Sequence, residues 1–278
     1  MGNPTVKSPP PAARGRSQQM GRIVSIHSYR GGTGKSNISA NLAYLAARRG
    51  KRVAVLDTDL QAPGVHLLFG FDTNRMPYTL SDFLFNRCGL EEAAYNLKGV
   101  AELKDIGGSV FLLPSRMTVD AIMKVIAEGY DVGKLNDQLN HLIERLSLDL
   151  LLIDTHPGFN EETLLTLAIS DTLVIVLRPD KQDYHGTAVL VEVAGRMAVP
   201  HVHMLANKVF GNVDKDDIRQ KIQQSYGHDV IGILPFAEDM ARLGSEGIFA
   251  ARCPSHSLSQ ELDAVVQRII EHRGRADR

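Results

Sequence analysis

Short apolar runs recur along this chain and alternate with segments in which apolar residues follow a helical spacing. The runs are rich in Val, Ile and Leu, which is typical of buried strands. They lie at 22–27, 52–57, 109–113, 149–154, 172–177, 201–208 and 229–236. Helical spacing is found at 37–47, 132–146, 184–197 and 257–271. Two such strands joined by a helix form a right-handed βαβ unit with parallel pairing, so the pattern predicts an α/β fold.

The region from 65 to 148 is less regular than the rest. Besides the strand at 109–113, which Pro114 closes, we expect helices at 78–85, 91–95 and 117–127. The methionine and aromatic side chains of this region are expected to lie in the core.

The composition is that of an ordinary globular protein. The chain has 278 residues, of which 44% are hydrophobic and 23% charged, and its formal net charge is −1. This balance exerts no overall attraction on nucleic acid or membrane. Cys88 and Cys253 lie far apart in the sequence, which favours a reducing cytosol over a zinc or iron–sulfur site. Because the N-terminus also lacks the apolar stretch of a signal peptide, we expect a cytoplasmic protein.

The two ends of the chain differ from the rest in composition. Residues 1–20 form a Pro-rich basic leader without an acidic residue, which we expect to be disordered, and Met20 is an alternative start. One folded domain is expected over 21–272, followed by a basic tail over 273–278.

The strand at 22–27 leads into a glycine-rich turn that ends in Lys-Ser and is followed by a helix. Strand, glycine loop and helix in this order are the context that a phosphate-binding loop requires. Glycines let backbone N–H groups converge on phosphate oxygens, and the helix N-terminus adds a partial positive charge. Lys35 is expected to contact the β- and γ-phosphates, and the Ser36 hydroxyl to bind Mg²⁺. The nucleotide-binding residues predicted here are Gly31, Gly32, Thr33, Gly34, Lys35, Ser36 and Asn37.

The loop departs from the ordinary G-x-x-x-x-G-K-[ST] pattern, because Tyr29 occupies the first glycine position. It resembles the deviant P-loop of the ParA/MinD family of dimeric ATPases, K-G-G-x-G-K-[ST], with Arg30 in place of the signature lysine. The resemblance implies a catalytic contact between Arg30 and the nucleotide of a partner subunit. An arginine donates two parallel hydrogen bonds where a lysine offers a point charge.

Carboxylates follow two further buried strands, at Asp57, Asp59 and Asp154. Ligands of open α/β sheets bind beyond the carboxyl ends of the strands, so these side chains are expected beside the phosphates. Asp154 before a Pro-Gly turn follows the logic of a Walker B residue that holds Mg²⁺. The segment from Asp57 also resembles the family's D-x-D-x-Q segment. This implies that Asp59 orients the attacking water and that Asp57 supports Mg²⁺ through its water shell.

His156 lies in the turn after Asp154 and admits two interpretations. Histidine titrates near neutrality, so a general-base role is one hypothesis. Phosphoryl transfer depends mainly on positioning and electrostatics, so we favour a filler position in the turn.

Two later segments resemble the nucleoside side of the family's site. The strand at 201–208 ends in Asn-Lys, and the resemblance implies that Asn207 reads the adenine edge. Pro235, at the end of the strand at 229–236, resembles the adenine-stacking turn of the family.

The resemblance covers roughly residues 21–270. It implies a single-domain, doubly wound, mostly parallel sheet flanked by helices, with ATP or ADP and Mg²⁺ as cofactors. It also implies an ATP-dependent sandwich homodimer that hydrolyses ATP slowly and positions a cargo, which is DNA, a protein complex or a cell-division or motility component. A stimulating or cargo-adaptor protein is the expected further partner.

Two other classes of protein require residues that this sequence lacks. An iron–sulfur carrier ATPase of the same superfamily needs a cysteine pair near the C-terminal part of the sheet, and this sequence has none there. An autophosphorylating tyrosine kinase needs a C-terminal tyrosine cluster, whereas no tyrosine follows Tyr226. A nucleotide-dependent dimeric scaffold with little or no hydrolysis stays open, although Asp59 favours turnover.

The helix expected at 257–271 has one apolar face, which we expect to pack on the sheet and not to bind a membrane. Arginines near the C-terminus offer a modest patch for nonspecific, salt-sensitive DNA binding and hence for association with the nucleoid. They are Arg252, Arg268, Arg273, Arg275 and Arg278.

Overall fold

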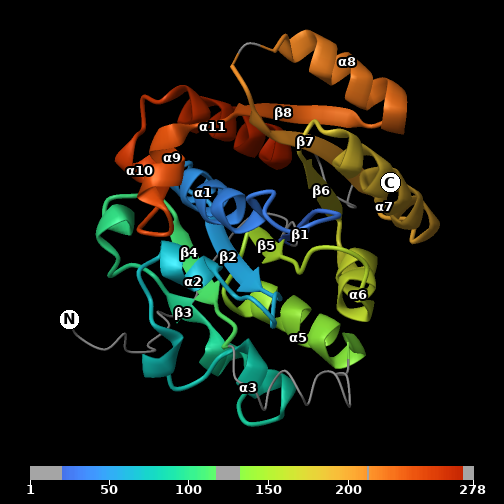
Figure 1. The fold of residues 1–278 in the computed structure, drawn as a ribbon. Coiled ribbons are helices and arrows are strands. Elements are labelled where there is room, and N and C mark those ends of the chain that lie inside the picture. Colours follow the sequence, from blue (N-terminus) through green and yellow to red (C-terminus); the bar gives the residue numbers. More distant parts are fainter. Residues whose placement is uncertain (1–20, 117–131, 212, 272–278) are drawn as a thin grey trace.

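The computed structural model describes residues 21–116, 132–211 and 213–271, and within them strands and helices alternate around one central sheet (Figure 1). The strands are β1 (Arg22–His27), β2 (Arg52–Asp57), β3 (Tyr95–Asn96), β4 (Ser109–Leu113), β5 (Leu150–Asp154), β6 (Thr172–Leu177), β7 (His201–Val209) and β8 (Asp229–Pro235). The helices are α1 (Lys35–Arg48), α2 (Val65–Leu68), α3 (Leu80–Leu84), α5 (Val132–Arg145), α6 (Glu161–Ile169), α7 (Lys181–Arg196), α8 (Lys215–Tyr226), α9 (Glu238–Leu243), α10 (Phe249–Arg252) and α11 (Ser257–Glu271).

The sheet has the strand order β3-β4-β2-β5-β1-β6-β7-β8, and every pairing is parallel except that of the edge strand β3. The chain therefore starts in the middle of the sheet and builds outward in both directions, as in a doubly wound fold. This confirms the predicted α/β class with a mostly parallel sheet and flanking helices.

Both faces of the sheet are covered, which is why its strands read as nearly continuous apolar runs. Within β1, Val24 and Ile26 face the side on which α1 and α11 pack, whereas Ile23 faces the side of α3 and α5. A third cluster joins β6, β7 and β8 to α7 and α8. The helix predicted at 257–271 is α11, and its apolar face packs on β8 and α1 as expected.

One predicted helix, at 91–95, is wrong. A single 3-10 turn covers Leu90–Ala93, and the chain then extends into β3, where Tyr95 pairs with Leu112. The Tyr95 ring is buried, and its hydroxyl donates to the Tyr78 carbonyl over 2.7 Å. Burial of this ring against the sheet edge outweighs the local helical tendency.

The boundaries of the other predicted elements differ little from those observed, whereas the helices α2, α6, α8, α9 and α10 were not predicted. Helix α7 begins at Lys181, three residues before the predicted start, because the Asp180 carboxylate caps it by accepting from the Asp183 N–H over 3.0 Å. The predicted helix at 117–127 lies outside the described residues. In the described ranges, no helix combines the length and the apolar character needed to cross a membrane.

Candidate functional site

Three neighbouring strands bring their carboxyl ends to the same edge of the sheet. Strand β5 lies between β1 and β2, and Asp154 is in register with Ile26 on one side and Asp57 on the other. The loop after β1 leads directly into α1 at this edge. The structure thus brings together the predicted phosphate loop and the predicted carboxylates.

The backbone of the phosphate loop is shaped by its glycines. Gly32 and Gly34 have φ values of 75° and 95°, left-handed values that glycine adopts without strain. A Cβ atom on Gly34 would lie 2.7 Å from Asn207 Nδ2, so a side chain has no room there. Among the described residues, no side chain caps α1 at Gly34, so the N–H groups of its first turn stay open to an anion. Gly31 is exposed in this loop and Thr33 is buried.

Lys35 places its ammonium group inside the loop. The residue is 7% exposed, and its Nζ donates to Ser28 Oγ over 3.0 Å. Burial lowers the pKa of this ammonium, and the nearby charges of Asp154, Asp59 and Asp57 oppose the change. Three carboxyl groups thus lie near Lys35, and carboxylate oxygens are the ligand type that Mg²⁺ prefers.

Asp154 accepts hydrogen bonds from two hydroxyl groups of α1. Ser36 Oγ donates to Oδ2 over 2.7 Å, and Ser39 Oγ donates to Oδ1 over 3.1 Å. Ser39 is not among the predicted site residues, although its spacing of three from Ser36 places both on one helix face. Burial raises the pKa of Asp154 to about 6, against the lowering effect of both serines and Lys35.

Asp57 is fully buried beside Asp154 and binds the backbone of its own loop. Its Oδ1 accepts from the Asp59 N–H over 3.1 Å, and its Oδ2 accepts from Gly64 and Val65 over 3.0 and 3.2 Å. Burial raises the pKa of Asp57, and the charge of Asp154 raises it further. Asp57 therefore holds the loop after β2, and its support of Mg²⁺ stays a prediction.

Asp59 lies in this loop and contacts the turn after β5. His156 Nδ1 lies 2.8 Å from Asp59 Oδ1, which also accepts from the Ala62 N–H over 2.9 Å. Both side chains are half-buried. The interpretation of His156 as a filler position therefore misses a direct contact with the residue expected to orient the attacking water.

On the other side of the loop, Asn207 and Lys208 hold its carbonyl groups. Asn207 Nδ2 donates to the Thr33 carbonyl over 2.7 Å, and Lys208 Nζ donates to the Gly32 carbonyl over 2.7 Å. Asn207 thus braces the loop, and its predicted contact with the adenine edge stays a prediction. A cavity of about 300 Å³ opens here. Its lining includes Asn37, Ile38, Pro235, Phe236, Met240 and Leu262.

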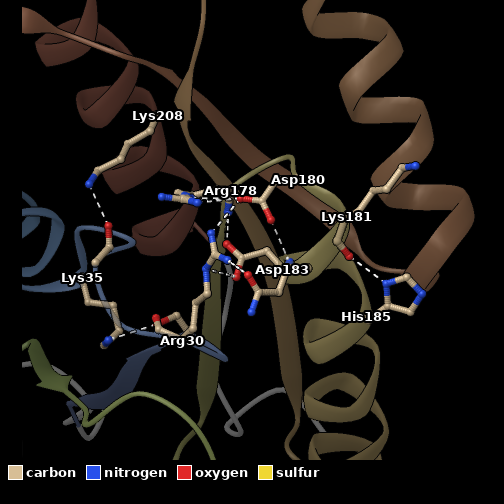
Figure 2. A network of polar contacts seen from close by, with 11 residues as sticks. Arg30, Lys35, Arg178, Asp180, Lys181, Asp183, His185 and Lys208 are labelled. Atoms are coloured by element: carbon tan, nitrogen blue, oxygen red, sulfur yellow. Dashed lines mark hydrogen bonds and ion pairs between the residues drawn. The ribbon is translucent and has the colours of Figure 1, made fainter.

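Arg30 is held by residues of its own chain at the N-terminus of α7 (Figure 2). Its guanidinium lies 2.7 Å from Asp180, 3.1 Å from Asp183 and 2.5 Å from Gln182. Arg178 shares Asp180 Oδ2 at 2.7 Å. The side chain of Arg30 is 22% exposed, so a contact with a partner subunit would require it to leave this acidic site.

Tyr29, which replaces the first loop glycine, packs against α7 and the turn after β5. Its ring centroid lies 6.0 Å from that of Phe159. A Cβ atom on Gly186 would lie 2.0 Å from the Tyr29 ring, so the ring fills the space that the missing side chain leaves. The tyrosine at the first glycine position of the loop is thus accommodated by a glycine, Gly186, within α7.

A phosphate loop at a helix N-terminus, facing buried carboxylates on neighbouring parallel strands, defines the class of P-loop nucleotide-binding proteins. A family described as an AAA domain matches residues 21–203. The septum site-determining protein MinD of Bacillus subtilis is 25% identical over 258 residues, which are 90% of each chain. An iron–sulfur cluster carrier protein of Pyrococcus horikoshii is 27% identical over 272 residues, 90% of this chain and 88% of that one.

The fold is also similar to that of a solved MinD. The structure of the septum site-determining protein MinD with Mg-ADP from Pyrococcus horikoshii matches with a TM-score of 0.75 and 22% identity. The match covers 90% of this chain and 96% of that one. The chain belongs to the ParA/MinD family of P-loop ATPases.

We expect Asp154→Asn to stabilise the metal-free protein at pH 7.5. A carboxyl whose folded pKa is raised to about 6 destabilises the fold when ionised, and this penalty disappears as the pH falls toward the ordinary aspartate pKa of about 3.9. The variant should melt at least about 3 °C higher at pH 7.5, and the difference should shrink by pH 4.5. Calorimetry at both pH values measures this, and an equal difference at both contradicts the pKa argument.

We expect Gly186→Ala to destabilise the protein by about 1–3 kcal/mol, because the new methyl group overlaps the Tyr29 ring. Gly195→Ala on the same helix is the matched control, since a Cβ atom there meets nothing within 4 Å. It should be neutral or stabilising. Urea unfolding measures both, and Tyr29→Ala should rescue Gly186→Ala. A variant as stable as the control would show that Tyr29 moves away freely.

Proposed function

We propose that this protein is a Mg²⁺-dependent ATPase that acts as an ATP-dependent dimerising switch and positions or partitions a cargo. The observation that carries the proposal is the convergence of Lys35, Ser36 and Asp154. The lysine ammonium lies inside the loop, and the serine hydroxyl lies 2.7 Å from the aspartate. This is the set of groups that phosphoryl-transfer sites use for phosphate and for Mg²⁺.

The residues present fit a magnesium nucleotide. The open N–H groups of α1 and the Lys35 ammonium suit phosphate oxygens. The cavity beside Asn207 and Pro235 is lined mainly by apolar side chains, which suits the binding of a nucleotide base. Ser36 and Asp154 would hold Mg²⁺, and Asp57 would support them. When bound, Mg²⁺ neutralises charge on the β- and γ-phosphates.

Hydrolysis would proceed by attack of water on the γ-phosphorus, which breaks its bond to the bridging oxygen of ADP and releases phosphate. Asp59 would orient the water, and Lys35 would stabilise the negative charge of the transferred group. The buried Asp57 carboxylate accepts from the backbone N–H groups of Asp59 and Gly64 and so holds the loop that carries Asp59. This supports a defined position for Asp59.

Dimerisation would place Arg30 against the nucleotide of a second copy. In the single chain Arg30 is held by Asp180 and Asp183, so the trans contact would compete with these ion pairs. A cross-interface contact would thus form only when the phosphate charge outweighs the local carboxylates. This supports a switch in which nucleotide state controls assembly.

The proposed cargo is DNA, a protein complex or a cell-division or motility component. The name of the similar Bacillus subtilis protein concerns septum placement, and this supports a positioning role. A regulator that stimulates hydrolysis, and weak nonspecific DNA binding, belong to the same proposal. The similarity to an iron–sulfur carrier does not favour that function, because Cys88 and Cys253 are far apart in the sequence and form no Cys-x-x-Cys pair.

The test of ATP binding and turnover compares Lys35→Ala with Asp59→Ala. Lys35→Ala should lower ATP affinity at least about 100-fold, because it removes charge-assisted bonds to the phosphates. Asp59→Ala should keep ATP affinity but lower kcat about 100-fold and accumulate the ATP-bound dimer. Calorimetry, phosphate release and light scattering measure the three quantities. Unchanged affinity in Lys35→Ala rejects the phosphate assignment, and a wild type that dimerises without turnover favours the scaffold alternative.

Asp180→Asn tests the hold on Arg30. Asparagine keeps the cap of α7 but weakens the ion pair, so half-maximal dimerisation should need about threefold less ATP. Glu192→Gln is the matched control, because it removes one negative charge from an exposed ion pair with Arg196 on the same helix. It should leave the ATP concentration for half-maximal dimerisation unchanged. Arg30→Ala should abolish the dimer while leaving ATP binding to the monomer. A variant Asp180→Asn that behaves like the control contradicts the competition.

A further inference from the structure

We propose that His156 is a positioning residue for hydrolysis, which holds the Asp59 carboxylate and couples it to the phosphate loop. The inference rests on the proposed ATPase function and adds a residue to it. It starts from the hydrogen bond of 2.8 Å between His156 Nδ1 and Asp59 Oδ1. The two residues come from segments 97 positions apart, the loop after β2 and the turn after β5.

Asp59 depends on this contact for its orientation. Its carboxylate otherwise accepts only from the Ala62 N–H of its own loop, over 2.9 Å, among the hydrogen bonds of the described residues. The loop is anchored through Asp57, two residues earlier, and the anchor acts on the backbone and not on the Asp59 side chain. His156 therefore supplies the one hydrogen bond to this carboxylate from another segment of the described chain.

The backbone around His156 is tied to the P-loop strand. The Thr155 hydroxyl donates to the Ile26 carbonyl over 2.9 Å and lies 2.6 Å from His27 Nδ1. The Gly158 N–H donates to the Ser28 carbonyl over 3.0 Å. Ser28 Oγ in turn accepts from Lys35 Nζ. A continuous set of contacts thus runs from the phosphate-binding lysine through the turn to His156.

The chemistry of the pair defines which atom matters. A carboxylate only accepts hydrogen bonds, so His156 Nδ1 is the donor and the imidazole tautomer is set by Asp59. The side chains are 24% and 15% exposed, so solvent competes only partly for the bond. A restrained carboxylate stays near the geometry it needs to orient a water, and small displacements of such groups cost rate more than affinity.

Variants of His156 separate this role from others. His156→Ala should lower kcat about tenfold and leave KM for ATP within twofold, because only the orientation of Asp59 is lost. His156→Asn places an amide N–H near the Nδ1 position and should restore kcat to within about threefold of wild type. In an Asp59→Ala background, His156→Ala should have no further effect, since the acceptor of its hydrogen bond is already gone.

These outcomes decide the inference. An unchanged or increased kcat in His156→Ala overturns it, as does an Asn variant no better than Ala. A tenfold loss that persists in the Asp59→Ala background assigns His156 a role of its own and also overturns it. If the wild-type protein binds but does not hydrolyse ATP, the proposed enzymatic function fails independently of this pair.

Amide hydrogen exchange tests the pair without turnover. In the nucleotide-free protein, the Ala62 amide that bonds Asp59 should exchange about tenfold faster in His156→Ala than in wild type or His156→Asn. The amides of Gly64 and Val65, which bond Asp57, are internal references and should be unchanged. Equal exchange of Ala62 in all three proteins overturns the positioning role even if hydrolysis is never observed.

Discussion

The burial of two neighbouring carboxyl groups at the carboxyl edge of the sheet is the constraint on which the site depends. Asp57 and Asp154 are paired in register on adjacent strands, and both are almost inaccessible to water. Burying such groups is costly unless hydrogen bonds and opposite charge compensate. Two serine hydroxyls, three backbone N–H groups and the Lys35 ammonium supply this compensation, and in doing so they shape α1, the loop after β2 and the phosphate loop.

The departures from the ordinary loop pattern are accommodated at one place, the N-terminal half of α7. Tyr29 occupies the space above Gly186, and Arg30 lies between Asp180 and Asp183. Neither substitution would be tolerated by the loop alone, because an aromatic ring needs a cavity and a guanidinium needs acceptors. Helix α7 and its N-cap residue thus provide the space and the acceptors that the loop after β1 requires.

The two loops that flank the carboxylates are connected by side chains as well as by the sheet. The bond between His156 and Asp59 joins them on one side of the loop after β1, while Asn207 and Lys208 brace the carbonyl groups of this loop beside the cavity that Asn37 and Pro235 line. Such polar contacts tie segments that are far apart in sequence to one edge. The mostly parallel sheet and its flanking helices are those of the ParA/MinD family. The contacts of His156, Asn207 and Lys208 depend in addition on the particular side chains of this chain.

The sequence by itself determined the α/β class, most strand positions, the helices α1, α3, α5, α7 and α11, and the glycine loop with its nearby carboxylates. Apolar periodicity and glycine spacing are local properties of the chain, which is why they could be recognised. The extended conformation at Tyr95, the role of Ser39 and the contact of His156 with Asp59 were decided only by the tertiary structure. Each of them joins residues brought together by strand order and helix packing, and a linear pattern does not encode such distances. The same reason explains Arg30, whose residue type was evident from the sequence but whose acidic partners, Asp180 and Asp183, were not, because Asp180 lies 150 positions away.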